Sequence, residues 1–375
     1  MKVGVLGGGQ LGRMMALAGV PLGQEFVFLD PAEDACAGVV GDLICAPYDD
    51  EAALAQLADA VDIVTYDFEN VPVASARSLS DSLPVFPRYQ ALEVSQDRLR
   101  EKTFFSDAGI PCALFASVDS YDDLVSAADE MGYPCVLKTR RMGYDGKGQR
   151  IIQDRQQVDQ AWSDLGGQAL ILEAFVRFKR ELSIIAARST RGETVFYPLT
   201  ENRHKDGILI TSFAPANAGL LVERARAYAI KVLDNLDYCG VLTIEFFDVD
   251  DGLVANEMAP RVHNSGHWTI DGAVTSQFEN HLRAIMGWPL GSTDPVGASA
   301  MLNWIGAMPD PSNALSYPNA HWHDYGKKPR AGRKVGHVTI NAENILALQA
   351  ELGKFALALG EQLKESGVEA FTRGH

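Results

Sequence analysis

Two glutamates, one on each side of a short turn, have the type and spacing of residues that could bind a cation. Glu245 and Glu257 each lie six positions from Asp251, within two strand-like segments, 241–247 and 253–257, that Asp-Asp-Gly separates. This pattern favours a hairpin, so we expect the two carboxylates to face each other across the ladder, ~5 Å apart. Like charges at that distance need a cation between them. Mg²⁺ with nucleotide phosphates fits, with Asn256 as a further amide ligand; the alternative is two carboxylates splayed into solvent.

A cationic glycine loop is the second such feature. Lys138 ends an apolar segment, 135–138, and Arg-Met-Gly-Tyr-Asp-Gly-Lys-Gly-Gln follows at 141–149. The glycines supply backbone freedom and Lys147 a charge, so the loop can close as a flap over a polyanion. The Walker pattern G-x-x-x-x-G-K-[ST] is absent around it. The alternative is a glycine-rich hairpin with solvated charges.

Another glycine loop, Gly-Gly-Gly-Gln-Leu-Gly at 7–12, follows an apolar strand-like segment and opens a helical pattern. Backbone N–H groups in such a loop can approach a phosphate at the start of a helix. Asp30, 18 positions beyond Gly12, could bind a ribose hydroxyl as in a dinucleotide fold. A tight strand-to-helix turn without a ligand is an equally good interpretation.

Two polar clusters are further candidates for ligand binding. Pro-Arg-Val-His-Asn-Ser-Gly-His-Trp at 260–268 gathers an arginine, two imidazoles, an amide and a hydroxyl after the second glutamate, which favours substrate contacts over purely structural histidines. Five cations stand among the nine residues 326–334. A solvated charge run is the usual interpretation of such a segment. In an acidic chain we instead favour a site for a phosphate-bearing ligand.

The composition of the chain limits the classes of protein to which these features can belong. The chain has 375 residues, 47% of them hydrophobic, and 33 Lys+Arg against 49 Asp+Glu, a net charge of −16. That length suits two or three domains, and the charge opposes a broad nucleic-acid or anionic-membrane surface. No signal peptide and no apolar run near ~18 residues is evident. Five scattered cysteines without a C-x-x-C pair argue against a disulfide framework or structural zinc and indicate a reducing cytoplasm.

The secondary-structure pattern of the segments that must position these residues changes along the chain. Strand-like segments at 3–6, 26–29 and 61–66 alternate with helical patterns, which predicts a parallel sheet covered on both faces. From residue 111 onward, strand-like segments follow one another at 135–138, 149–152, 169–174, 181–187 and 194–199, with little helix between them. A long helix is expected around 222–236, and one or two amphipathic helices over 342–367.

Five motifs occur in an order that carries a family resemblance. They are Gly-Gly-Gly-Gln-Leu-Gly-Arg-Met at 7–14, Asp-Phe-Glu-Asn-Val at 67–71, Gly-Tyr-Asp-Gly-Lys-Gly-Gln at 143–149, the 256–269 segment from Asn-Glu-Met-Ala-Pro to His-Trp-Thr, and Gly-Arg-Lys-Val-Gly-His at 332–337. Over nearly its whole length the chain resembles the N5-carboxyaminoimidazole ribonucleotide synthetases, ATP-grasp enzymes of purine biosynthesis. The 256–269 segment is specific to this family, whereas the glycine loops are shared more widely.

The resemblance implies a reaction and a fold. ATP, bicarbonate and 5-aminoimidazole ribonucleotide would give ADP, phosphate and N5-carboxyaminoimidazole ribonucleotide through carboxyphosphate, with Mg²⁺ as cofactor. The α/β chain would form a Rossmann-like parallel-sheet domain (1–110), a small α+β ATP-grasp lid (111–180) and a larger α+β domain with an antiparallel sheet (181–375). It would be a cytoplasmic homodimer that hands its product to the N5-carboxyaminoimidazole ribonucleotide mutase, without binding nucleic acid or membrane.

The resemblance also implies residue roles. ATP would contact Arg98, Lys138, Gly143, Tyr144, Asp145, Gly146, Lys147, Gly148, Gln149, Glu173, Ala174, Phe175, Val176, Glu181, His204, Asn256 and Glu257, with 173–176 at the adenine edge. Mg²⁺ would bind Glu245 and Glu257. The ribonucleotide would contact Gln10, Leu11, Glu69, Tyr144, Asp145, Lys147, Arg261, His263, Lys327, Arg333 and Lys334; of all these, Lys138, Lys147, Arg261 and His263 would be catalytic. Two residues depart from the family pattern: Asp67 stands where Glu is common, and Lys147 where Arg is frequent.

Three other functions fit part of the pattern. An NAD-dependent dehydrogenase would use the first glycine loop and Asp30 but leaves the second loop and the glutamate pair unexplained. A catalytically silent nucleotide-binding or assembly protein would not need the full set of cations and carboxylates. A sister ATP-grasp ligase acting on another phosphoribosyl amine is the nearest variant.

Overall fold

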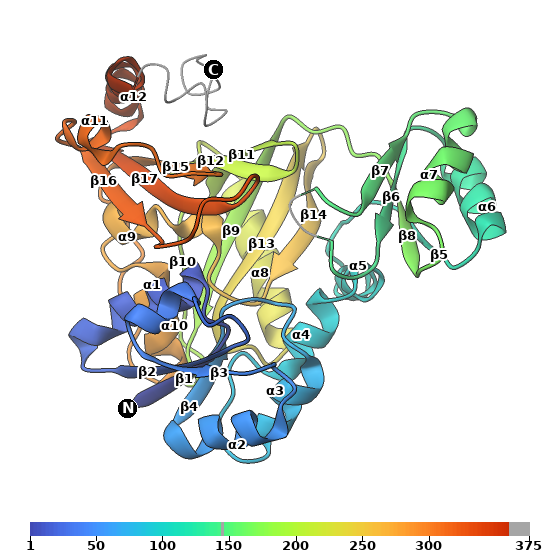
Figure 1. Cartoon of the computed structure of the whole chain (residues 1–375). Helices are drawn as coiled ribbons and strands as arrows, with labels where there is room; N and C mark the ends of the chain where they lie inside the picture. Colours follow the sequence, from blue (N-terminus) through green and yellow to red (C-terminus); the bar gives the residue numbers. More distant parts are fainter. Residues whose placement is uncertain (144–145, 360–375) are drawn as a thin grey trace.

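A computed structural model describes residues 1–143 and 146–359, which form three sheets (Figure 1). The first is parallel, in the order β3-β2-β1-β4. Its strands are mostly apolar and buried on both faces, which is typical of a parallel sheet between helices. This unit comprises β1 (Lys2–Leu6), α1 (Gln10–Gly19), β2 (Glu25–Asp30), β3 (Asp42–Cys45), α2 (Glu51–Ala60), β4 (Ile63–Tyr66) and α3 (Val73–Ser80). The predicted parallel sheet is confirmed, with β3 as a strand that the sequence pattern missed.

A small antiparallel sheet, in the order β5-β8-β6-β7, stands to one side of the rest of the molecule (Figure 1). Two helices, α4 (Tyr89–Ser95) and α5 (Arg98–Asp107), lead into it. It comprises β5 (Phe115–Val118), α6 (Tyr121–Met131), β6 (Cys135–Thr139), β7 (Gln149–Ile152), α7 (Val158–Leu165) and β8 (Leu170–Ala174). The expectation of little helix here was wrong for α7, because only Val158 and Ala161 of that short, polar helix are buried.

The third sheet is large and antiparallel, in the order β14-β13-β9-β11-β12-β15-β17-β16, with β10 also paired to β9. Its strands are β9 (Arg180–Arg188), β10 (Thr194–Phe196), β11 (Thr200–Lys205), β12 (Ile208–Ala214), β13 (Gly240–Val249), β14 (Gly252–Ala259), β15 (Ala298–Ile305), β16 (Ala320–Asp324) and β17 (Lys334–Ala342). Its helices are α8 (Leu221–Asn235), α9 (Thr269–Gly272), α10 (Gln277–Ile285), α11 (Pro311–Leu315) and α12 (Ile345–Leu359). The strand predicted over 194–199 ends at Phe196, and the predicted tail beyond residue 359 lies outside the described residues.

One apolar core joins the first sheet to the large sheet. Met15 and Phe26 of the first unit pack in the same cluster as Ile185, Val241 and Phe278 of the third. Helix α10 contacts α1 on one side and β13 and β9 on the other. The shared core fixes these two units against each other, so a site between them has rigid walls. Among the described residues no helix has the length and apolar character to cross a bilayer.

Candidate active site

One large cavity, of about 1060 Å³, is lined by all three units. Its walls include the turn after β1, the start of α5, strands β6 and β7 with the loop between them, and the β13–β14 hairpin. Of the residues predicted from the sequence, it is lined by Gln10, Leu11, Glu69, Arg98, Lys138, Gly143, Gly146, Lys147, Gln149, Glu181, His204, Glu245, Asn256, Glu257, Arg261, His263, Lys327, Arg333 and Lys334. Five motifs far apart in the chain therefore meet in one place.

A few predicted residues lie elsewhere. Glu173, Ala174, Phe175, Val176 and Gly148 are not among the lining residues, and Tyr144 and Asp145 lie outside the described residues. Glu173 is buried next to the cavity at the end of β8, where it pairs with Lys138. Its neighbours on the chain lead from β8 to β9, beside this wall.

Glu245 and Glu257 pair directly across the β13–β14 ladder, as the hairpin pattern predicted. This pairing does not come from a turn centred on Asp251, as the equal spacing suggested. The hairpin turns between the paired residues Val249 and Gly252. That register alone would place Asn256 opposite Glu245. A β-bulge at Asn256 adds one residue to β14, and this extra residue brings Glu257 opposite Glu245.

The environment of this pair favours a hard cation. Burial raises the pKa of Glu245 to about 7, an effect that the charges of Glu257 and Glu181 increase and that of His204 opposes. The oxygen donors at the pair are its own two carboxylates and the Asn256 amide, ligands that Mg²⁺ prefers. Arg98 NH1 lies 3.5 Å from Glu257 Oε2 and His263 Nε2 lies 3.5 Å from Glu245 Oε1. The residues present therefore fit a magnesium ion.

His204 and Glu181 form a second polar group on the same wall. The His204 Nδ1 lies 2.7 Å from Glu181 Oε2, across the β9–β11 pairing. Burial alone would lower the pKa of His204, but its hydrogen bond to Glu181 and the charge of Glu245 raise it. A protonated imidazole at this position can contact a phosphate or ribose oxygen.

A buried group of charges connects the small antiparallel sheet to helix α5. Lys138 Nζ lies 3.0 Å from Glu173 Oε2, and Lys102 Nζ lies 3.4 Å from the same oxygen. Burial would raise the pKa of Glu173, but the two ammonium groups lower it, so the carboxylate is ionised. Glu173 Oε1 is buried without a hydrogen-bond partner among the described residues. An orphaned buried acceptor of this kind is open to a donor from outside the chain.

The sequence reasoning missed Glu101 and Lys102, two buried residues of α5 in this region. Each is about 2% exposed. They lie in the run Arg-Leu-Arg-Glu-Lys at 98–102, whose composition is typical of a solvated helix face. No local signal separates a charged residue that packs against another unit from one that faces water.

The first glycine loop is filled by the chain itself. Asp67 accepts hydrogen bonds from the backbone N–H groups of Gly9 and Gly12. Asp30 accepts from Gly8 N at 2.7 Å and from Tyr48 Oη at 2.9 Å. The Asp67 carboxylate occupies the position that a phosphate would take in a dinucleotide fold, and Asp30 is bonded within the chain. The dinucleotide interpretation of the loop was therefore wrong.

The other end of the cavity is basic. Lys327, Arg330, Arg333 and Lys334 line it from the segment that leads into β17. Arg261 forms an ion pair with Glu69 of the first unit. This wall can bind an anionic group close to the turn after β1.

His263 is a neutral imidazole within this basic wall. Burial and the charges of Arg261 and Lys334 hold its pKa well below the usual range. Its Nδ1 lies 2.9 Å from Ser265 Oγ. A neutral ring beside two cations can accept or orient a proton near a bound substrate.

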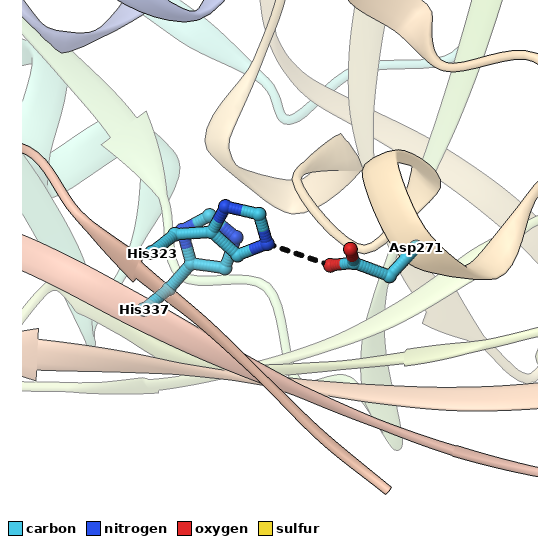
Figure 2. A group of neighbouring side chains, drawn as sticks. All are labelled: Asp271, His323 and His337. Atoms are coloured by element: carbon cyan, nitrogen blue, oxygen red, sulfur yellow. Dashed lines mark hydrogen bonds and ion pairs between the residues drawn. The ribbon is translucent and has the colours of Figure 1, made fainter. Parts of the chain in front are cut away.

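A separate cluster is formed by Asp271, His323 and His337 (Figure 2), which are not among the residues that line the cavity. His323 Nε2 bonds Asp271 Oδ2 at 2.7 Å, and His337 Nδ1 bonds the Tyr325 hydroxyl at 2.8 Å. The two imidazoles stack with centroids 4.3 Å apart and planes 12° from parallel. A ring nitrogen binds a metal in its own plane, and no nearby point lies in both planes. The cluster therefore braces α9 against β16 and β17 and does not form a cation site.

Comparisons with known proteins agree with this geometry. The family model described as ATP-grasp domain matches residues 103–278. The ribonucleotide synthetase preATP-grasp domain matches residues 1–96, and the phosphoribosylaminoimidazole carboxylase C-terminal domain matches residues 299–351. The preATP-grasp match covers the parallel-sheet unit, the ATP-grasp match covers the small sheet and the large sheet through β14, and the C-terminal match covers β15 to part of α12.

Individual relatives match over almost their whole length. The N5-carboxyaminoimidazole ribonucleotide synthase of Pseudomonas aeruginosa is 53% identical over 354 residues, which cover 94% of this chain and 98% of that protein. The crystal structure of the Thermus thermophilus synthetase is 53% identical, with a TM-score of 0.92 over 96% of this chain and 99% of the other. An Aspergillus clavatus synthase in complex with ADP and 5-aminoimidazole ribonucleotide is 30% identical, with a TM-score of 0.88 over 96% and 98% of the two chains.

Proposed function

We propose where each substrate binds in this chain, which belongs to the N5-carboxyaminoimidazole ribonucleotide synthase family of ATP-grasp enzymes. The chain is thus an ATP-dependent ligase that carboxylates 5-aminoimidazole ribonucleotide. In this proposal Mg·ATP binds between the lid and the β13–β14 hairpin, and the ribonucleotide binds at the basic end of the same cavity. One observation carries this assignment. The Glu245–Glu257 pair, Lys138 and the basic wall all line one continuous space.

The ATP end is defined by charge and by one orphaned acceptor. Arg98, Lys138 and Lys147 line the cavity and can neutralise the phosphates, with the 143–149 loop as the flap over them. Glu173 Oε1 can accept a hydrogen bond from the adenine amino group, since it is buried without another partner among the described residues. Ala174, Phe175 and Val176 would follow along the adenine edge, and Glu181 and His204 would contact the ribose and phosphates.

Magnesium would be held by Glu245 and Glu257, with Asn256 beside them. The bound ion would neutralise charge on the β- and γ-phosphates during transfer. The chain prepares this site by placing two carboxylates in direct register where their repulsion favours a cation.

The ribonucleotide end pairs a basic wall with polar groups of the first unit. Lys327, Arg333 and Lys334 would bind the 5′-phosphate. Gln10, Leu11 and Glu69 line the facing wall, where the ribose hydroxyls can bind. The exocyclic amine would then lie near Arg261 and His263, between the two ends of the cavity.

The reaction follows from this arrangement. Bicarbonate is a poor electrophile, so an oxygen of bicarbonate accepts the γ-phosphoryl group and ADP departs, giving carboxyphosphate. The amine attacks the carboxyl carbon, the C–O bond to phosphate breaks, and the amine loses a proton. Lys138 and Lys147 stabilise the transferring charge, and Arg261 and His263 orient the carboxyl group and the amine. Closure of the flap would keep water from the mixed anhydride.

The proposal also covers the enzyme's location, its oligomeric state and the fate of its product. The net charge of −16 and five unpaired cysteines suit a cytoplasmic enzyme. The family resemblance favours a homodimer. A carbamate product is labile, which favours hand-off to the N5-carboxyaminoimidazole ribonucleotide mutase.

The test is ADP release with bicarbonate and 5-aminoimidazole ribonucleotide each omitted in turn. We expect fast release only when both are present, and incorporation of labelled bicarbonate into an acid-labile product. ADP release at the same rate with and without the ribonucleotide would instead favour a sister ATP-grasp ligase acting on another phosphoribosyl amine.

A further inference from the structure

Lys102 is a buried lysine whose contacts lie around the proposed magnesium site without lining the cavity. Its Nζ donates to the carbonyl oxygen of Asn256 at 2.7 Å and lies 3.4 Å from that of Ala255. The side chain is 2% exposed and comes from α5, which leads into the lid. A buried ammonium with these partners holds the backbone of β14 at the bulge.

The bulge is what this contact stabilises. Ala255 pairs with Phe246, Glu257 pairs with Glu245, and Asn256 is the unpaired residue between them. An extra residue in a ladder leaves backbone groups without their usual cross-strand partners. Lys102 satisfies the carbonyl of that residue, so it favours the bulged register over the regular one.

Glu101, the preceding residue of α5, contacts the other side of Glu257. Its Oε1 accepts a hydrogen bond from the backbone N–H of Met258 at 2.8 Å. Consecutive residues of one helix thus hold the carbonyl before Glu257 and the amide after it. The backbone of Glu257 is fixed on both sides by groups from outside its own sheet.

The same ammonium also reaches the lid. Lys102 and Lys138 share Glu173 Oε2, at 3.4 and 3.0 Å. Lys138 lines the cavity on β6, and Glu173 lies on β8 of the same small sheet. Lys102 therefore connects the hairpin that carries Glu257 to the strands that carry the phosphate-binding lysine.

We propose that Lys102, assisted by Glu101, is a positioning residue that sets the β14 bulge and so holds Glu257 opposite Glu245 for Mg·ATP. This inference rests on the proposed magnesium role of the glutamate pair. It assigns Lys102 no contact with substrate. Its effect passes through Asn256 to Glu257, and through Glu173 to Lys138.

The experiment compares the wild-type enzyme with Lys102→Met and Lys102→Arg. We expect Lys102→Met to raise the half-saturating Mg²⁺ concentration and the KM for ATP at least tenfold. The KM for 5-aminoimidazole ribonucleotide should stay within twofold, because Lys102 contacts nothing at the basic end. Lys102→Arg keeps a cation and donors and should recover most of the Mg²⁺ dependence. A purely structural role would instead lower the melting temperature and leave the Mg²⁺ dependence unchanged.

Lys231→Met is the matched control. Lys231 also donates to a backbone carbonyl, that of Gly109 at 2.9 Å, but from the exposed face of α8 away from the cavity. It should leave all three constants unchanged. If Lys102→Met does not fold, Lys102→Gln is measured in its place, because its uncharged side chain is one atom shorter and can no longer connect the Asn256 carbonyl to Glu173.

Glu257→Gln separates this inference from the assignment on which it rests. If Glu257→Gln shifts the Mg²⁺ dependence and neither neutral variant of Lys102 does, the positioning role is wrong and the magnesium site stands. If Glu257→Gln leaves the Mg²⁺ dependence unchanged, the magnesium assignment fails, and the positioning role fails with it.

Discussion

Asp67 places its carboxylate in the turn after β1, where the backbone N–H of Gly9 donates to it. The residue is 6% exposed and sits at the end of β4, beside β1. An anion-binding turn is thus occupied by an anion of the chain. The glycines permit this close approach, since a Cβ added at Gly9 would collide with the Asp67 carboxylate. The pattern typical of a dinucleotide loop serves here to join two strands and to shape one end of the cavity.

The first prediction concerns nucleotide selectivity. Mg·ADP at about 100 times its Kd should stabilise the enzyme by roughly 2.7 kcal/mol, a rise in melting temperature of roughly 3 °C. NAD⁺ at the same concentration should cause no shift, because Asp67 fills the turn that would bind its phosphates. Differential scanning fluorimetry measures both. Lys138→Met should lose the ADP shift, and a shift with NAD⁺ alone would contradict this account of the turn.

The second prediction concerns Glu257→Gln. Removing one carboxylate of the opposed pair should lower the rate of ADP formation by on the order of 100-fold or more, because charge neutralisation at the transferring phosphate is lost. The melting temperature should stay the same or rise, since repulsion with Glu245 is relieved. Steady-state kinetics with circular dichroism checks both expectations.

Asp250→Asn is the control for that variant. Asp250 lies in the turn of the same hairpin, where it pairs with Lys179 at 3.0 Å and its side chain is 92% exposed. Its loss should change neither the rate nor the fold. Equal losses of activity in both variants would mean that the hairpin responds to any change of charge, and would remove the metal assignment of Glu257.

The third prediction concerns Arg261→Lys. Arg261 pairs with Glu69 through Nε and donates from NH1 to the carbonyl of Val262 at 3.0 Å. A lysine cannot make these two contacts in a fixed plane, so the KM for the ribonucleotide should rise roughly 10- to 100-fold. The KM for ATP should change less than twofold. Arg283→Lys, which breaks a similar pair with Glu279 on the partly exposed side of α10, is the control and should leave both constants unchanged.

Several features of the site were predictable from local pattern. Asp-Asp-Gly between apolar segments predicted the hairpin, although the direct pairing of Glu245 with Glu257 also needs the bulge at Asn256. The loop at 141–149 was predictable because glycines and cations alternate between two strands, and Gly143, Gly146 and Lys147 indeed line the cavity. Such signals are short in range, and turn chemistry determines them.

Other features depend on contacts that no local pattern contains. The bulge at Asn256 is held by Lys102, 154 positions away in the chain. Burial of Glu101 and Lys102 follows from the packing of α5 against β14, although their sequence reads as a solvated helix. Asp67 and Gly9 are brought together only by the pairing of β1 with β4. Here the tertiary arrangement overrides the local preference.

The fourth prediction concerns stability in acid. His281 is buried on α10, where its Nδ1 accepts the backbone N–H of Val241 at 3.0 Å and its Nε2 bonds Thr65 Oγ1 at 2.7 Å. Because Val241 is a donor, Nδ1 must be unprotonated. Burial lowers the pKa of His281 to about 4, from an ordinary value of 6.5. The imidazole thus links the first unit to the large sheet only in its neutral form.

The sign of the effect follows from proton binding. Between pH 6.5 and about 4 the unfolded chain protonates this histidine and the folded chain does not. His281 therefore contributes its full stabilisation above pH 6.5, and the free energy of unfolding should fall by about 1.4 kcal/mol per pH unit below it. His281→Gln should be less stable at pH 7.5 but lose stability less steeply toward pH 4.5, as urea unfolding at several pH values would measure. Exposed His321→Gln should keep the wild-type slope, and parallel slopes for wild type and His281→Gln would contradict the assignment.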